Sequence, residues 1–204
     1  SACLVGSEMC IRDRDTISSL SELKAYGSKV LLVYGGGSIK KNGLYDTAMK
    51  ILKDAGLTVF ELSGVEPNPK IETVRKGVEI CKNEGIDMVL AIGGGSTIDC
   101  SKVVAAGAKY DGDAWDLVLD GSKVKAALPI FDVLTLSATG TEMDPFAVIS
   151  DMSKNEKWGT GSPYMVPTMS ILNPEYTFSV SKKQTAAGTA DMMSHTMENY
   201  CLLY

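Results

Sequence analysis

DMVLAIGGGSTIDCSKVVAAGAK, residues 87–109, joins a short apolar run, a glycine-rich turn and a longer segment of helical character. The apolar run is rich in Val, Leu and Ile, which is typical of a strand buried on both faces of a parallel sheet. KVLLVYGGGSIKKNG, residues 29–43, repeats the same order of features. Two such units predict an α/β protein with a parallel sheet.

Apolar runs alternate with amphipathic segments along the chain from about residue 29. Right-handed crossovers would bring the carboxyl ends of the strands to one edge of the sheet, so ligands are expected there. We predict strands at Val30–Tyr34, Leu57–Leu62, Asp87–Ile92 and Pro129–Leu136, with helices at about 41–55, 70–84 and 96–108.

The pattern changes after Leu136. Residues 139–180 contain Gly, Pro and Thr turns around two short apolar runs, Ala147–Ser150 and Met169–Leu172, which predicts hairpin-like elements rather than another βαβ unit. From Ser181 the sequence indicates a helix that continues to the last residue without a stop signal, so we expect a fragment of a longer protein. Residues 1–14 have no clear periodicity and are left unassigned, as a candidate artefact.

The composition excludes several classes of protein. A net charge of −5 without a basic patch argues against nucleic-acid binding, and 45% hydrophobic residues argue against disorder. No apolar run is long enough for a membrane span and no signal peptide is evident, so a cytoplasmic location is expected. The five cysteines show no metal-binding spacing and are expected to be free thiols.

The two glycine-rich turns, residues 35–38 and 93–96, each follow a predicted strand and precede a helix. Helix N-termini offer unpaired N–H groups and partial positive charge, and glycine lets a phosphate approach the backbone closely. Neither turn matches GxGxxG, and each alone could be a tight turn without a ligand. Their repetition favours phosphate binding.

Asp99 and Asp191 each allow two interpretations. Asp99 follows Ser96 by three residues, so it either completes a helix cap or lies near the nicotinamide end of a bound dinucleotide. Asp191 and His195 share one helix face, where they form either a surface pair or half of a divalent-metal site. His195 is the only histidine in the sequence, which excludes a second histidine ligand from this chain.

Together these segments resemble the iron-containing alcohol dehydrogenase family, in particular its NADPH-dependent butanol dehydrogenase and aldehyde reductase branch. The resemblance covers residues 28–204. It rests on YGGGSIKKNG (34–43), EPNP (66–69), AIGGGSTIDCSK (91–102), LTLSATGTE (134–142) and GTADMMSHTMENY (188–200).

The resemblance implies a dinucleotide-binding α/β domain, residues 15–180, followed by the first helix of an all-helical metal-binding domain, residues 181–204. Asp191 and His195 would be two ligands of Fe²⁺ or Zn²⁺, and two more histidines would lie beyond Tyr204. No catalytic residue is implied beyond the metal site. The implied cofactor-binding residues are Gly36, Gly37, Ser38, Lys41, Asn68, Gly94, Gly95, Ser96, Asp99, Thr135, Thr139 and Lys157.

The cofactor expected from this resemblance is NADP(H) rather than NAD(H). NAD-dependent members carry a carboxylate near the end of the first strand, whereas residues 34–43 here contain Ser38, Lys40 and Lys41 and no acid. At least one of the two lysines is expected to be ordinary helix surface. Ser137 and Asn173 depart from the residues common in relatives, Pro and Asp respectively.

The implied reaction is hydride transfer between NADP(H) and a primary alcohol or aldehyde such as butanol or butanal, with a metal ion polarising the oxygen. The chain alone is expected to be inactive because its metal site is incomplete. A homodimer is left open, and neither nucleic acid nor a membrane is an expected partner. The alternatives are a glycerol dehydrogenase or dehydroquinate synthase-like enzyme, or a nucleotide-binding fragment without catalysis.

Overall fold

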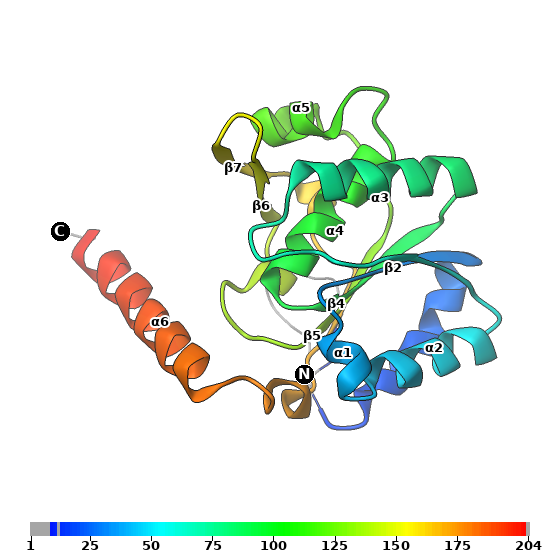
Figure 1. The fold of residues 1–204 in the computed structure, drawn as a ribbon, viewed down its shortest axis with the longest axis horizontal. Coiled ribbons are helices and arrows are strands. Elements are labelled where there is room, and N and C mark those ends of the chain that lie inside the picture. The colour runs from blue at the N-terminus through cyan, green and yellow to red at the C-terminus, as the bar shows by residue number, and fades with distance from the viewer. Residues whose placement is uncertain (1–8, 12, 203–204) are drawn as a thin grey trace.

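The computed structural model describes residues 9–11 and 13–202. Its centre is a six-stranded sheet in the order β1-β8-β5-β4-β2-β3, and every neighbouring pair in it is parallel (Figure 1). This pairing confirms the α/β class. The strands are β1 Met9–Ile11, β2 Lys29–Tyr34, β3 Thr58–Leu62, β4 Met88–Gly93, β5 Ile130–Leu134 and β8 Met169–Ile171.

Helices cover both faces of this sheet. Because side chains alternate along a strand, Leu31 and Val33 of β2 pack with α3, α4 and α5, whereas Val30 and Leu32 pack with α2 and η1. These two apolar clusters form the core. The helices are η1 Thr16–Tyr26, α1 Ser38–Lys41, α2 Leu44–Asp54, α3 Ile71–Glu84, α4 Gly95–Gly107, α5 Ala114–Leu119 and α6 Lys182–Leu202, with short 3-10 turns at η2 Gly121–Lys123, η3 Thr141–Met143, η4 Pro163–Met165 and η5 Pro174–Thr177.

The structure differs from the sequence prediction at three places. The helix predicted at 41–55 is divided into α1 and α2 by Gly43, whose φ of 78° lies in the left-handed region. Residues 9–11, within the unassigned N-terminal segment, form β1 and pair with β8. Residues 169–171, expected in a hairpin-like element, form a parallel strand beside β5. A strand of three residues is too short for its hydrophobic pattern to show which strand it pairs with.

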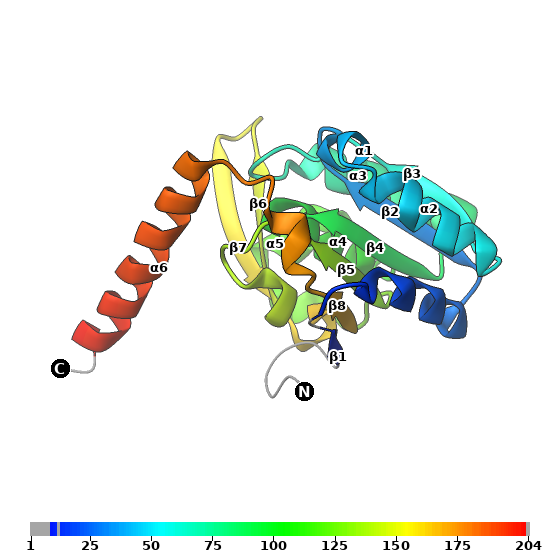
Figure 2. The same cartoon turned by 90° about the horizontal axis from the view of Figure 1, so that it is seen from below.

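The predicted hairpin is present between β5 and β8 in the sequence. Strands β6 Phe146–Asp151 and β7 Glu156–Gly161 pair antiparallel and lie outside the main sheet. Figure 2 shows them between the sheet and α6. The N–H of Ser150 donates to the carbonyl of Pro69 at 2.9 Å, which fixes the hairpin to the loop after β3.

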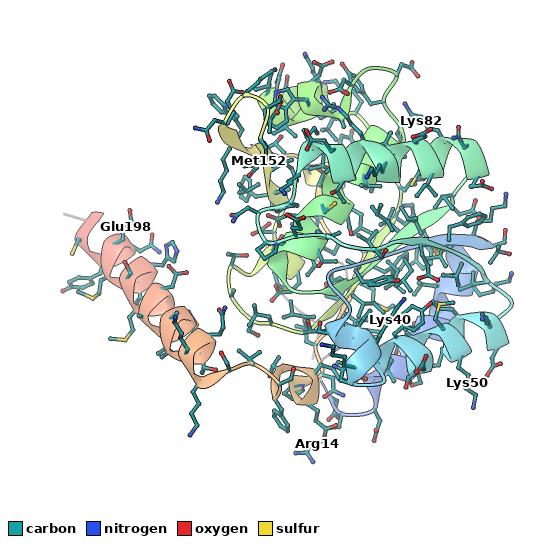
Figure 3. All side chains as sticks on the ribbon, in the orientation of Figure 1. Arg14, Lys40, Lys50, Lys82, Met152 and Glu198 are labelled. Carbon is teal, nitrogen blue, oxygen red and sulfur yellow. The ribbon has the colours of Figure 1, made fainter. Side chains whose placement is uncertain are left out.

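Helix α6 projects from the rest of the molecule (Figures 1 and 2). Its side chains stand clear of the sheet and its covering helices, Glu198 near the far end among them (Figure 3). Met192, Met193, Met197 and Tyr200 are all more than half exposed. Among the described residues, no helix is both long and apolar enough to cross a membrane.

Candidate functional site

A cavity of about 310 Å³ lies over the N-terminus of α4, at the carboxyl edge of the sheet. Its walls come from the start of α4, the loops after β3 and β5, and the hairpin. Six residues predicted from the sequence are thereby brought together, although they are widely separated in the chain. The lining residues are Asn68, Pro69, Gly95, Ser96, Asp99, Leu136, Ala138, Thr139, Val148 and Lys157.

The first turn of α4 forms the floor of this cavity. Gly94 is the N-cap residue and makes no side-chain hydrogen bond, so no side chain satisfies the amides of the first turn. A Cβ added to Gly95 would lie 3.3 Å from Thr139 Oγ1, and one added to Gly94 would lie 3.2 Å from Leu136 Cβ. The glycines therefore keep the helix terminus close to the loop after β5 and open to an anion.

Asp99 joins α4 to the hairpin. Its Oδ1 accepts a hydrogen bond from Thr141 Oγ1 at 2.6 Å, and its Oδ2 accepts one from the N–H of Val148 at 2.9 Å. Burial raises the pKa of Asp99, while these two hydrogen bonds oppose the rise. The capping interpretation is wrong, because the cap position is occupied by Gly94 and no side chain caps the helix.

Lys102 follows one turn later on α4, and its side chain is fully buried. Its Nζ donates to Thr141 Oγ1 at 2.9 Å and to Asp144 Oδ1 at 2.9 Å. It also contacts the carbonyls of Asp144 at 2.7 Å and Phe146 at 2.8 Å. Burial lowers the pKa of Lys102, and Asp144 opposes that change. Lys102 was not predicted as a site residue, although a lysine within the apolar run SKVVAAG indicates a buried charge.

Asp132 lies beneath the same loop, at the centre of β5. Its Oδ2 is 2.7 Å from Ser170 Oγ, which is also 3.0 Å from the carbonyl of Glu142. Burial raises the pKa of Asp132 well above its ordinary value, which favours the protonated carboxyl. In its protonated form Asp132 would donate to Ser170, and the Ser170 hydroxyl would be free to donate to the carbonyl of Glu142.

The hairpin and the loop after β3 meet at the rim of the cavity. Lys157 Nζ donates to Asn68 Oδ1 at 2.7 Å, and both side chains are exposed. Asn68 has a left-handed φ of 55°, which turns the loop toward the hairpin. This contact places a cation and an amide beside the N-terminus of α4, where a phosphate would find both charge and donors.

The first glycine-rich turn lies outside this cavity, after β2. Gly37 has a left-handed φ of 97°, and a Cβ on Gly36 or Gly37 would have no neighbour within 4 Å. Ser38 and Lys41 are exposed and three residues apart, so they share one face of α1. The turn is thus open to a ligand group.

Lys40 points to a different environment from Lys41. Its Nζ lies 4.9 Å from the ring centre of Tyr34 and 4.5 Å from that of Tyr45. The two tyrosine hydroxyls donate to Glu61 of β3 at 2.6 and 2.8 Å. The hydrogen bond from Tyr34 is the main cause of the lowered pKa of Glu61. Lys40 is the one of the two lysines that has a structural role, at α1 in Figure 3.

Besides the four predicted residues of the first turn, two more predicted cofactor residues do not line the cavity. Gly94 lies at its edge as the N-cap of α4. Thr135 is half-buried, and its N–H donates to the carbonyl of Gly93 at 2.9 Å, which continues the pairing of β5 with β4. Its backbone therefore contributes to the geometry of the turn, and cofactor binding by its side chain stays a prediction.

Asp191 and His195 lie on the exposed surface of α6. Asp191 Oδ1 is 3.7 Å from His195 Nε2, and Glu198 Oε2 is 3.9 Å from His195 Nδ1. No group of three or more His, Cys, Asp or Glu side chains that could hold a metal ion occurs within residues 9–11 and 13–202. One carboxylate and one imidazole suit Fe²⁺ or Zn²⁺ but make only part of a four-ligand site.

The cysteines whose side chains are described are free thiols, as predicted. Cys81 and Cys100 are buried and Cys201 is exposed. Burial raises the pKa of both Cys81 and Cys100 to about 12, so they are unreactive at neutral pH. Cys3 lies outside the described residues, as does the side chain of Cys10.

A parallel sheet with a cavity over a helix N-terminus, beside glycine-rich turns, defines the class of dinucleotide-binding α/β domains. The model of the iron-containing alcohol dehydrogenase family matches residues 8–174. The chain belongs to this family, as the sequence resemblance predicted.

Individual relatives agree with this assignment. The chain is 64% identical over 179 residues to NADH-dependent butanol dehydrogenase A of Clostridium acetobutylicum, covering 88% of this chain and 46% of that protein. It is 38% identical over 190 residues to NADPH-dependent aldehyde reductase YqhD of Escherichia coli, covering 92% and 49%. The chain thus spans about half the length of the curated relatives it matches.

Solved structures show the same relationship. The crystal structure of NADH-dependent butanol dehydrogenase A from Thermotoga maritima has a TM-score of 0.90 and 45% identity, covering 97% of this chain and 50% of that one.

Proposed function

We propose that this chain is the cofactor-binding part of a metal-dependent oxidoreductase that transfers hydride between NADP(H) and a primary alcohol or aldehyde, such as butanol or butanal. The observation that carries the proposal is the cavity over the N-terminus of α4, which joins Gly95 and Ser96 to Asn68, Thr139 and Lys157. The names of the relatives support alcohol and aldehyde chemistry over that of a glycerol dehydrogenase or a dehydroquinate synthase.

In this proposal the pyrophosphate lies at the N-terminus of α4. Gly94, Gly95 and Ser96 supply N–H donors and the positive end of the helix dipole, and Lys157 adds charge from the rim. Titration of the 204-residue chain with NADPH and NADH, followed by nicotinamide fluorescence, tests the proposal. Saturable binding of either cofactor is expected, and binding of neither would contradict it.

We further propose that NADP(H) is preferred. No residue from 34 to 43 is acidic, and the open turn at Gly36 and Gly37 leads to Ser38 and Lys41 on one exposed face. A 2′-phosphate would there meet the hydroxyl of Ser38 and the cation of Lys41, while the carboxylate of Glu61 is engaged by the hydroxyls of Tyr34 and Tyr45. Because relatives at 64% and 59% identity are named NADH-dependent, the same titration decides this point: tighter NADH binding would overturn it.

Asp191 and His195 are proposed as two of the ligands of Fe²⁺ or Zn²⁺ in the complete enzyme. A bound metal ion would supply Lewis-acid polarisation of the substrate oxygen. The residues of this chain bind and orient the dinucleotide and hold a carboxylate and an imidazole on α6. With only these two ligands the chain alone would bind metal weakly and show no turnover. A nucleotide-binding module without catalysis is then the behaviour expected of the isolated chain.

A further inference from the structure

Two residues of α4, Asp99 and Lys102, contact the same stretch of chain, which we name the bridging segment and define as residues 141–148. They are three residues apart and therefore lie on one face of the helix. Asp99 accepts hydrogen bonds from both ends of the segment, at Thr141 and Val148. Lys102 donates to Thr141 and Asp144 and to the carbonyl of Phe146.

The hydroxyl of Thr141 links the two helix residues. A threonine hydroxyl carries one hydrogen, and Asp99 Oδ1 at 2.6 Å is the acceptor that can take it. The Thr141 oxygen is then free to accept from Lys102 Nζ at 2.9 Å. Lys102 thereby determines the direction of the Thr141 hydroxyl, and the hydroxyl in turn holds Asp99.

The bridging segment connects two walls of the cavity. Thr139 lies two residues before its start, and Val148 is its last residue; both line the cavity together with Asp99. In the proposed function, the adenosine ribose lies beside residues 36–38 and the pyrophosphate at Gly94–Ser96. The remaining half of the dinucleotide, the nicotinamide mononucleotide, then falls between Asp99, Val148 and Lys157.

We infer that Lys102 is a positioning residue for the nicotinamide half of the cofactor, acting through Thr141 and Asp99 on the wall that carries Thr139 and Val148. This inference rests on the proposed function. Lys102 is fully buried, so its effect on binding is indirect. It acts on the cofactor only through the residues that it holds in place.

Binding of NADPH and of adenosine 2′,5′-bisphosphate to the same variants tests the inference, since the second ligand has no nicotinamide half. Thr141→Val removes the hydroxyl but keeps the shape of the side chain, and Thr141→Ser keeps the hydroxyl. We expect Thr141→Val to weaken NADPH binding by about fivefold, the effect of one lost hydrogen bond. Thr141→Ser should retain wild-type affinity, and neither variant should change the affinity for the bisphosphate.

Lys102→Met should weaken NADPH binding by about tenfold or more, again without changing bisphosphate binding. If this variant does not fold, the Thr141 pair decides the question alone. Equal losses for both ligands would mean that the cluster only stabilises the fold, and unchanged NADPH affinity in Thr141→Val would equally overturn the inference. A wild-type chain that binds neither ligand would instead refute the proposed function.

Discussion

At the scale of single residues, burial is the main influence on the pKa values of the ionisable side chains beneath the cavity wall. Burial penalises the charged form of Asp132, Asp99 and Lys102. It therefore raises the pKa of the two carboxyl groups and lowers the pKa of the lysine. Lys102 and Asp99 contact the loop between β5 and β6 or the start of β6, and Asp132 is linked to that loop through Ser170. The polar interior is thus concentrated beneath the part of the chain that forms the cavity wall.

Asp132 provides a pH-dependent prediction. Its folded pKa is raised, so its contribution to stability is complete below the unfolded carboxyl pKa of about 3.9 and is lost as the pH rises through the folded pKa. Asp132→Asn mimics the protonated carboxyl and should be more stable than wild type at pH 7, by about 1–3 kcal/mol. Urea unfolding between about pH 4.5 and 8 measures this. A difference that does not grow with pH would show that Asp132 is not protonated.

Lys40 and Lys41 provide a matched pair. Lys41→Met should weaken NADPH binding by about three- to fivefold and leave NADH binding unchanged, because an exposed lysine can pair with a 2′-phosphate. Lys40→Met is the control, since Lys40 is held over Tyr34 and Tyr45. A larger NADPH loss in Lys40→Met than in Lys41→Met would reverse the assignment of the two lysines.

At the scale of elements, the central strands could be predicted closely from the sequence. The runs predicted at Val30–Tyr34 and Asp87–Ile92 match β2 and β4 to within one residue, because strands covered on both faces are continuous apolar runs. Short elements could not be predicted in this way. Strands β1 and β8 have three residues each, and their structure depends on pairing with neighbouring strands. The same limit applies to α5, which was not predicted.

The candidate site could be predicted from the sequence only where its residues lie close together in one loop. The glycine-rich turns identify the N-terminus of α4, but Lys102 and Glu61 act through partners 16 to 44 residues distant in sequence. Glu61 was not predicted for this reason: it belongs to β3, and the pairing of β3 with β2 brings it to Tyr34. Asp99 was assigned two roles from the sequence, and the cap was excluded because the N-cap of the helix is Gly94 rather than Ser96.

The first turn of α4 can be tested directly. Gly95→Val should abolish NADPH binding while the chain still folds, because the branched side chain would fill the space beside Thr139 that a pyrophosphate needs. Gly95 does not have a left-handed φ, so the expected effect is steric. Circular dichroism and fluorescence titration on one sample measure both properties. Gly188→Val on α6 is the control, and normal affinity in a folded Gly95→Val chain would mean that the turn holds no ligand.

At the scale of the whole molecule, the cavity proposed for the cofactor and the proposed metal ligands belong to different parts of the structure. The cavity is built on the sheet and the hairpin, whereas Asp191 and His195 lie on the projecting helix α6. A substitution on one part should therefore leave the other unchanged.

His195→Ala tests this separation. In the 204-residue chain it should leave NADPH affinity within about twofold of wild type, because α6 is remote from the cavity. When the chain is fused to the C-terminal half of the Clostridium relative, His195→Ala should remove stoichiometric metal and butanal-dependent NADPH oxidation while cofactor binding remains. Metal analysis after dialysis and absorbance at 340 nm provide the readouts. Tight metal binding by the unfused chain, or full turnover by the fused variant, would show that the metal site lies elsewhere.

The strand order also has a consequence for how the molecule is made. From β2 onward, each strand of the sheet joins an edge that already exists: β3 and β4 flank β2, β5 joins β4, and β8 joins β5. A chain leaving the ribosome can therefore extend the sheet strand by strand, without waiting for a distant partner. Only β1 must wait, since its neighbour β8 is the last strand of this sheet to be synthesised. The cavity wall, which lies between β5 and β8, is consequently among the last parts to be completed.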